Sequence, residues 1–372
     1  MNARYDHDDH GLLPRGKGRV TARATTPIGL TRRAALRRAA ACLREATSVL
    51  ITTHLGADPD GLGSALALAS ALERIGIPAE IALGCTVPER YRYMDRTARA
   101  RVYGANDSLP TADVVVVLDT SSGWDRIGAP GATIAARRAA KQCRVICLDH
   151  HPHTGIDVDI PVIDPHATAA AVLAYQLILL LTHSVTPEEA GWLYLGIVTD
   201  TASFRFPNTN AEAHRIVAEL AEHGADERRH YAEMYESTSI AKIRLLGEAL
   251  MGIQLTCDGH LAVITVTRDQ FKRYGLAVED APGFADHAAT VEGAAIGAAL
   301  LEFPDERTRV ILRASGDVPV DRIAKTIGGG GHTFAAAAVI TGNADDALRL
   351  LVASSCPYLT PNLPKEINPA AD

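Results

Sequence analysis

The stretch RVICLDHH, residues 144–151, joins an apolar strand pattern to three polar side chains at its end. Its β-branched and apolar first half is typical of a β-strand. A second stretch, DVVVVLD at 113–119, is apolar up to its final aspartate, as expected of a strand covered on both faces in a parallel sheet. Both stretches therefore place charged or imidazole side chains where a buried strand ends, which suggests a functional site.

Helical and strand patterns alternate on either side of these two stretches. SVLITT (48–53) and AEIALG (79–84) read as strands, and GSALALASALERIG (63–76) reads as a helix closed by Gly76. Two further helices are expected at about 168–182 and 187–199. This alternation predicts an α/β fold with an open, mostly parallel sheet and helices on both of its faces.

The pattern changes twice along the chain. Residues 1–30 lack periodicity and are predicted to be a disordered tail, whose DHDDH cluster (6–10) we interpret as solvated. A helix is expected from Thr31, with that residue as its N-cap. We predict a catalytic domain at 31–205, a helical connector at 206–245, a smaller C-terminal α/β domain at 246–355 and a tail at 356–372.

Composition limits the function. The 372 residues carry a net charge of −7, so the protein is not a general nucleic-acid coat, although metal ions would let it hold a short anionic substrate. The longest apolar run, at 169–181, is shorter than the ~20 residues of a membrane span. The six cysteines are scattered without a CxxC pair, which predicts reduced thiols and a cytoplasmic protein.

Several potential metal ligands follow strands or lie in the loops near their ends. In open α/β sheets, ligands bind at the carboxyl ends of the strands. Imidazole and carboxylate groups without cysteine suit Mn²⁺, with Mg²⁺, Fe²⁺ and Co²⁺ as alternatives. Four carboxylates and two imidazoles exceed the needs of one ion and suit two ions about 3.5–4 Å apart. The candidates are His54, Asp58, Asp60, Asp119, His150 and Asp200.

Some of these residues also have simpler interpretations. Asp60 lies in DPDG, a common turn sequence, and Asp119 could cap a following helix. The segment GGGGH at 328–332 permits close backbone approach to a phosphate, but a glycine run can also be a flexible linker.

Five motifs in order resemble the DHH phosphoesterase family. They are HLGADPDGLGS, LDTSS, LDHHP, GIVTDTASFRF and the C-terminal IAKTIGGGGHTFAAAA (323–338), which is similar to the glycine-rich signature of the DHH-associated domain. The resemblance spans about residues 48–340. SFRFPNTN (203–210) looks most like the branch of nanoRNases and pAp phosphatases, which includes hydrolases of linear dinucleotides.

The resemblance implies a role for each candidate ligand. His54 and Asp58 would bind a first metal, and Asp119 would bridge it to a second. The second metal would be bound by Asp60, His150 and Asp200.

The resemblance also implies roles away from the metals. His151 would face the phosphate, as an acid or as a donor to developing charge, and Asp149 would orient an imidazole. The expected substrate-binding residues are Arg205, Arg313, Gly329, Gly330, Gly331 and His332.

The implied activity is hydrolysis, by two metals, of short oligoribonucleotides, linear dinucleotides such as pApA, or 3′-phosphoadenosine 5′-phosphate (pAp) to mononucleotides. Short RNA or small adenine nucleotides are the expected binding partners. We expect no association with a membrane, and a homodimer is one expected assembly. Alternatives are an inorganic pyrophosphatase or polyphosphatase and an inactive nucleotide-binding regulator. The chain departs from the family pattern at Ala202 and at Ala337–Ala338, where glycine is usual, and in DPHATAA (164–170), which lacks one hydroxyl. These departures concern substrate fit.

Overall fold

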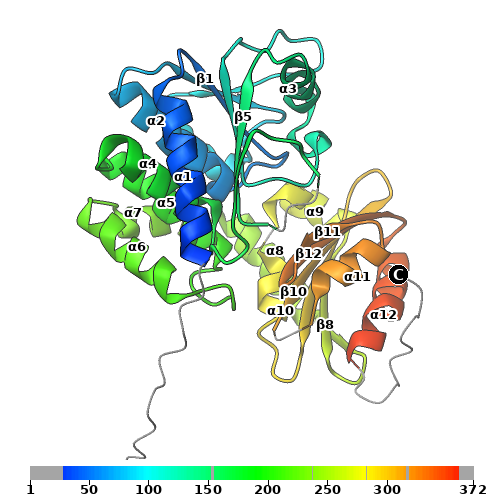
Figure 1. The fold of residues 1–372 in the computed structure, drawn as a ribbon. Helices are drawn as coiled ribbons and strands as arrows, with labels where there is room; N and C mark the ends of the chain where they lie inside the picture. The colour runs from blue at the N-terminus through cyan, green and yellow to red at the C-terminus, as the bar shows by residue number, and fades with distance from the viewer. Residues whose placement is uncertain (1–27, 152–154, 237, 282, 316–317, 360–372) are drawn as a thin grey trace, which may run out of the picture. The chain divides into compact units, whose positions relative to one another are not determined.

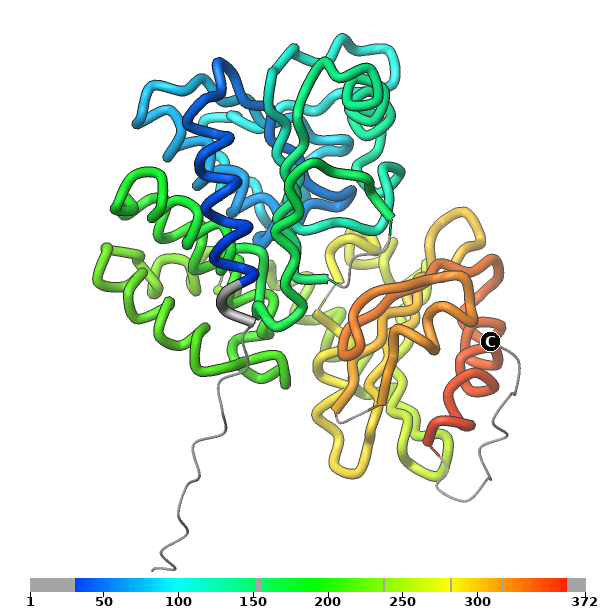
Figure 2. The backbone as a smooth tube through the Cα atoms, in the orientation of Figure 1, coloured from blue at the N-terminus to red at the C-terminus, as the bar shows by residue number. Residues whose placement is uncertain are grey.

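The computed structural model describes residues 28–151, 155–236, 238–281, 283–315 and 318–359. The chain forms two compact units that meet in sequence between Asp226 and Glu227, inside the predicted connector. Figure 2 traces the backbone of each unit in chain order. Residues 1–27, with the DHDDH cluster, and 360–372 lie outside the described residues. Residues 28–30, assigned above to the tail, already belong to the first helix, and residues 356–359 to the last.

The first unit contains a parallel sheet of six strands in the order β3-β2-β1-β4-β5-β6. Its strands are β1 (Val49–Thr53), β2 (Ala79–Leu83), β3 (Ala100–Val102), β4 (Val114–Leu118), β5 (Arg144–Asp149) and β6 (Ile160–Ile163). The sequence analysis did not identify the short strands β3 and β6. Strand order reverses between β1 and β4, the kind of position where ligands bind in open α/β sheets.

Helices cover both faces of this sheet, which confirms the predicted fold class. They are α1 (Ile28–Arg44), α2 (Pro59–Arg74), α3 (Ala129–Ala139), α4 (Ala170–Thr182), α5 (Pro187–Asp200) and α6 (Ala211–Glu222), with two 3₁₀ turns, η1 (Glu89–Asp95) and η2 (Trp124–Ile127). Ile134 of α3 packs with Leu50, Val115 and Val145 in one apolar cluster. Helix α2 contacts α4 and α5 on the other side of the strands (Figure 1).

Local chemistry explains where helices α2 and α5 begin. Asp58 caps α2, because its side chain accepts hydrogen bonds from the backbone N–H groups of Asp60 and Gly61. Thr186 and Glu189 form a capping box at the start of α5. The prediction that Thr31 caps the first helix was wrong, since α1 begins at Ile28 and includes Thr31.

The second unit contains a mixed sheet in the order β11-β12-β10-β9-β8-β7, in which only the β8–β9 pair is parallel among the described strands. Its strands are β7 (Gln254–Thr256), β8 (Leu261–Val266), β9 (Ile296–Glu302), β10 (Arg307–Ala314), β11 (Gly330–His332) and β12 (Ala335–Thr341). Its helices are α7 (Glu227–Tyr235), α8 (Ile240–Met251), α9 (Arg268–Tyr274), α10 (Phe284–Ala288), α11 (Val320–Thr326) and α12 (Ala344–Leu359), with the 3₁₀ turn η3 (Val278–Asp280).

The two faces of this second sheet are covered by different helices. Ile323 of α11 and Leu351 of α12 pack with Val310 in one apolar cluster. Leu245 of α8 and Phe284 of α10 belong to a second cluster.

The cysteines differ from the prediction of reduced thiols. Cys257 and Cys356 form a disulfide across 99 residues of the second unit, while Cys42, Cys85, Cys143 and Cys147 are free thiols. Sequence spacing could not indicate this pair, because its partners lie in a turn and in the last helix. Among the described residues, no helix combines the length and apolarity needed to cross a membrane.

Candidate metal centre

The predicted ligands of the first unit gather at the carboxyl ends of three neighbouring strands. His54 directly follows β1, Asp119 directly follows β4, and Asp149 is the last residue of β5. Because β1, β4 and β5 are adjacent in the sheet, these side chains meet at one edge. Asp60 reaches the same place from the start of α2, and Asp200 from the end of α5.

Asp119 lies between two imidazoles and presents one carboxylate oxygen to each. Its Oδ2 is 3.2 Å from Nε2 of His54, and its Oδ1 is 3.4 Å from Nε2 of His150. The residue is 4% exposed, and its backbone has a left-handed φ of 57°, which is strained for a residue other than glycine. A carboxylate in this position can offer one oxygen to each of two neighbouring ligand groups.

The remaining predicted ligands divide into two groups around Asp119. In the first group, Nε2 of His54 also lies 3.7 Å from Oδ1 of Asp58. In the second, Nε2 of His150 lies 3.0 Å from Oδ2 of Asp200 and 3.9 Å from Oδ2 of Asp60. Within each group the potential ligand atoms are all within 4.8 Å of one another, close enough to hold one ion.

Asp60 is held more firmly than the sequence suggested. Its two carboxylate oxygens accept hydrogen bonds of 2.7 Å from the backbone N–H groups of Ala170 and Ala171, in the first turn of α4. The side chain is fully buried, and Gly196 passes so close that a Cβ there would lie 2.8 Å from Oδ1 of Asp60. The helix N-terminus favours the ionised carboxylate and fixes its orientation.

The adjacent histidines have different nearest carboxylates, although both approach Oδ1 of Asp119, His150 through Nε2 at 3.4 Å and His151 through Nδ1 at 3.7 Å. Nδ1 of His151 lies 2.7 Å from Oδ1 of Asp149, and the backbone N–H of His151 donates to the same oxygen. Asp149 is fully buried, so it can fix the tautomer and the orientation of the His151 ring. The imidazole that Asp149 contacts is therefore His151, a choice that the sequence left open.

The pKa values show how charge is distributed without bound ions. Burial raises the pKa of Asp60 well above its usual value, and the charges of Asp119 and Asp200 raise this pKa further. Burial also raises the pKa of Asp200, although the hydrogen bond with His150 opposes the rise. Burial alone would raise the pKa of Asp119, but His150 and His54 outweigh it and lower that pKa.

Burial acts on the pKa values of the two imidazoles in the opposite direction from those of the carboxylates. Burial alone would lower the pKa values of His54 and His150, but neighbouring carboxylates, above all Asp119, raise both pKa values well above the usual value. Without ions, protons are thus shared among these groups, whereas additional positive charge would lower the pKa values and leave the carboxylates ionised and the imidazoles neutral. The oxygen and imidazole donors, with no thiolate in either group, fit two hard or borderline divalent ions.

The expected substrate-binding residues lie in both units. Arg205, in the first unit, is exposed, and its Nε donates to the backbone oxygen of Ala202. In the second unit, Arg313 on β10 is opposite Ala335 on β12, which is itself opposite His332 on β11. Directly opposed residues of antiparallel strands share a face, so Arg313 and His332 lie in one row on one face of this sheet.

The three glycines in and just before β11, Gly329, Gly330 and Gly331, have different surroundings. A Cβ on Gly329 would lie 2.1 Å from the backbone oxygen of Ala337, and a Cβ on Gly331 would lie 2.5 Å from that of Ala335. A Cβ on Gly330 would have no neighbour within 4 Å. Close packing against β12 thus explains Gly329 and Gly331, and leaves Gly330 as the position open to a ligand.

One contact of Arg313 was missed by the sequence analysis. Its Nε donates to Oδ1 of Asp286 on α10 at 3.1 Å, which holds the guanidinium at the face of the sheet. Twenty-seven residues separate the pair, and no local pattern marks Asp286 as a partner.

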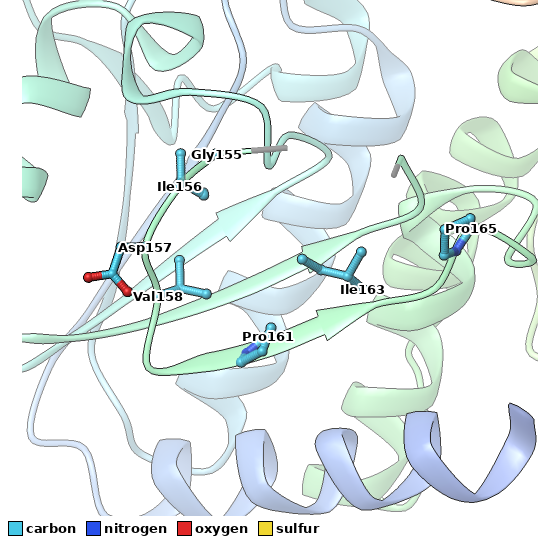
Figure 3. Close-up of a pocket in the computed structure, with 7 residues that line it drawn as sticks. All are labelled: Gly155, Ile156, Asp157, Val158, Pro161, Ile163 and Pro165. Carbon is cyan, nitrogen blue, oxygen red and sulfur yellow. The ribbon is translucent and has the colours of Figure 1, made fainter. Parts of the chain in front are cut away.

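A mainly apolar pocket lies beside β6, the edge strand of the sheet in the first unit. Figure 3 shows Pro161 and Ile163 on β6, with Ile156 and Val158 on the segment before it. The pocket is lined by Gly155, Ile156, Asp157, Val158, Pro161, Ile163 and Pro165, and none of these belongs to the two ligand groups.

Comparison with known proteins identifies the family. Residues 48–197 match the model of the DHH family, N-terminal domain. The chain is 30% identical over 295 residues to the bifunctional oligoribonuclease and PAP phosphatase NrnA of Thermus thermophilus, covering 79% of this chain and 84% of that protein. Its identity to the protein of the same name from Bacillus subtilis is 25% over 316 residues, covering 82% and 92%.

The fold has a counterpart among solved structures. An exopolyphosphatase-related protein from Bacteroides fragilis superposes with a TM-score of 0.81 at 23% identity, covering 88% of this chain and 98% of that one. Together with the strand-end ligand groups, these similarities confirm the resemblance drawn from the motifs. The chain belongs to the DHH family of phosphoesterases.

Proposed function

We propose that this phosphoesterase hydrolyses short oligoribonucleotides, linear dinucleotides such as pApA, or 3′-phosphoadenosine 5′-phosphate to mononucleotides, with Mn²⁺ as its preferred metal. The observation that carries the proposal is the position of Asp119, whose two oxygens face His54 and His150. The names of the relatives from Thermus thermophilus and Bacillus subtilis support this choice of substrates. Since these substrates are RNA fragments and nucleotides, we place the reaction in the cytoplasm.

Each ligand group would hold one ion. His54 and Asp58 would hold the first and share Asp119 with the second, which Asp60, His150 and Asp200 would complete. Two divalent ions supply Lewis acidity that activates water and neutralises phosphate charge.

The remaining candidate site residues act on the substrate rather than on the metals. His151, oriented by Asp149, donates a hydrogen bond or a proton to an oxygen of the reacting phosphate. In the second unit, Arg313 and His332 bind the nucleotide from one face of the sheet, where Gly330 allows close approach. Arg205 contributes a further positive charge in the first unit.

The test begins by stripping metal with a chelator and restoring Mn²⁺, Mg²⁺, Co²⁺ or Zn²⁺ separately. Products from pAp, pApA, short RNA and pyrophosphate are then separated by chromatography. We expect Mn²⁺ to restore the highest activity, on the nucleotide substrates. Preference for pyrophosphate would favour the pyrophosphatase alternative, and binding without hydrolysis would favour a regulator. The homodimer stays a prediction, which light scattering tests.

A further inference from the structure

The segment that follows Asp200 has an unusual backbone. Ala202, Ser203 and Phe204 have φ values of 46°, 59° and 64°, so three consecutive residues other than glycine are left-handed. Each such residue costs about 1–2 kcal/mol, and most for a bulky side chain such as Phe204. Strained backbone of this kind concentrates at functional sites.

Hydrogen bonds hold this turn in place. The backbone N–H of Phe204 donates to Oγ1 of Thr201 at 3.0 Å, and that of Arg205 donates to the backbone oxygen of Thr201 at 2.9 Å. Asn208 then ties the segment to a metal ligand, because its Nδ2 donates to the backbone oxygen of Asp200 at 3.0 Å. The turn is therefore fixed beside the metal centre.

The turn presents an aromatic pair and a cation at the surface. The half-buried ring of Phe204 stacks on the exposed imidazole of His214, in the first turns of α6, with centroids 4.9 Å apart and planes at 28°. The neighbouring Arg205 is exposed. Core packing does not explain this backbone strain, because the ring of Phe204 is only half-buried. Aromatic rings beside positive charge are the features with which proteins bind single-stranded nucleic acid.

We propose that Phe204 and His214 form a stacking platform for a nucleobase of the substrate, with Arg205 contacting a phosphate of the same nucleotide. The inference rests on the proposed function and adds a base-binding site within the first unit. A flat aromatic platform accepts any base, because every base has a π face. The site therefore selects nucleotide substrates over inorganic phosphate compounds without selecting a sequence.

The test compares two substrates that differ only in their bases: pApA and the same dinucleotide with hydrogen in place of both bases. Stacking contributes about 1–3 kcal/mol per base, so Phe204→Leu should lower kcat/KM for pApA by roughly 5- to 150-fold. Hydrolysis of the abasic analogue should be unchanged, and Phe204→Trp should retain activity on pApA. The matched control is Tyr231→Leu, which removes an exposed ring from the Tyr231–Tyr235 pair of α7.

A second measurement does not depend on catalysis. Metal-free protein should quench the fluorescence of a 2-aminopurine dinucleotide, and Phe204→Leu should weaken this binding while Tyr231→Leu does not. Equal losses on pApA and the abasic analogue, or no loss on pApA, would overturn the platform. If the wild-type protein hydrolyses none of the nucleotides, the proposed function fails instead, and the quenching assay still decides whether the platform binds a base.

Discussion

Nδ1 of His151 lies 2.7 Å from Oδ1 of Asp149, so this buried carboxylate fixes the orientation of the His151 imidazole beside the metal-ligand groups. The neighbouring His150 instead has Nε2 3.0 Å from Oδ2 of Asp200. The two rings are 4.5 Å apart and tilted by 60°, so residues adjacent in sequence enter different hydrogen-bond environments. This difference gives the first prediction.

Replacing either histidine should have a distinct effect on metal content. His150→Ala removes a ligand and should lose the second ion and nearly all turnover. His151→Ala should retain both ions and slow turnover by roughly 10²–10³-fold, as expected for a lost acid or oxyanion donor. Metal analysis by mass spectrometry, together with kcat, separates the two cases. Loss of an ion from His151→Ala but not from His150→Ala would reverse the assignment.

Asp149→Asn should alter the pH dependence. Burial alone would lower the pKa of His151, but the hydrogen bond to Asp149 and the charge of Asp119 raise that pKa above its usual value. Removing the charge of Asp149 lowers the pKa of His151, so the protonated form persists only to a lower pH. If His151 acts protonated, the alkaline limb of kcat/KM should move to lower pH, with a roughly 10–100-fold loss of rate.

The control for this change is Asp113→Asn. Asp113 accepts backbone hydrogen bonds from Thr47 and Ser48 and directly precedes β4. It therefore lies at the amino-terminal end of this strand, whereas the candidate metal centre lies at the carboxyl end. Its replacement should leave the pH profile in place. A profile that is unchanged in Asp149→Asn would show that this carboxylate does not tune His151.

Glycine substitutions should separate packing from ligand binding in the second unit. Gly331→Ala places a Cβ 2.5 Å from the backbone oxygen of Ala335, at a φ of 144°, and should lower the melting temperature. Gly330→Ala meets nothing within 4 Å and should preserve the melting temperature while raising KM for pApA. An unchanged KM in Gly330→Ala would mean that no ligand approaches this backbone.

Arg313→Ala should weaken binding of nucleotides more than it slows hydrolysis of small esters. A charge-assisted contact of about 1.5–3 kcal/mol corresponds to a loss of roughly 10- to 150-fold in kcat/KM for pApA. p-Nitrophenyl phosphate should be affected much less. Arg307→Ala, on the same strand and paired with the exposed Asp305, is the matched control. Equal losses on both substrates would assign Arg313 a role in the fold.

Ala202→Gly should stabilise the protein. Ala202 has a φ of 46°, and replacing alanine with glycine in the left-handed region relieves a strain of about 1 kcal/mol. Ala218→Gly, at an exposed position in the middle of α6, should instead destabilise by about 0.5–1 kcal/mol. Urea denaturation measures both effects. A destabilised Ala202→Gly variant would indicate that the Cβ of Ala202 makes a contact that outweighs the strain.

In the first unit, the sequence by itself determined strands β1, β2, β4 and β5, the polar residues at the ends of β1, β4 and β5, and the ligand types. The apolar runs before Asp119 and Asp149 are local patterns, and local patterns specify strands without any knowledge of their neighbours. The helix predicted at 63–76 and its closing Gly76 were equally local; α2 begins earlier, at Pro59, and Gly76 does adopt a left-handed φ of 83°. The motifs then indicated which side chains belong to one site.

Only the tertiary structure decided how these side chains meet. The order β1-β4-β5 places His54 and His150 on opposite sides of Asp119, and the first turn of α4 fixes Asp60 from 110 residues away. Cross-strand register aligns Arg313 with His332, and long-range packing brings Asp286 to Arg313. Strand order, register and packing depend on pairings between segments distant in the chain, for which periodicity within any one segment carries no signal.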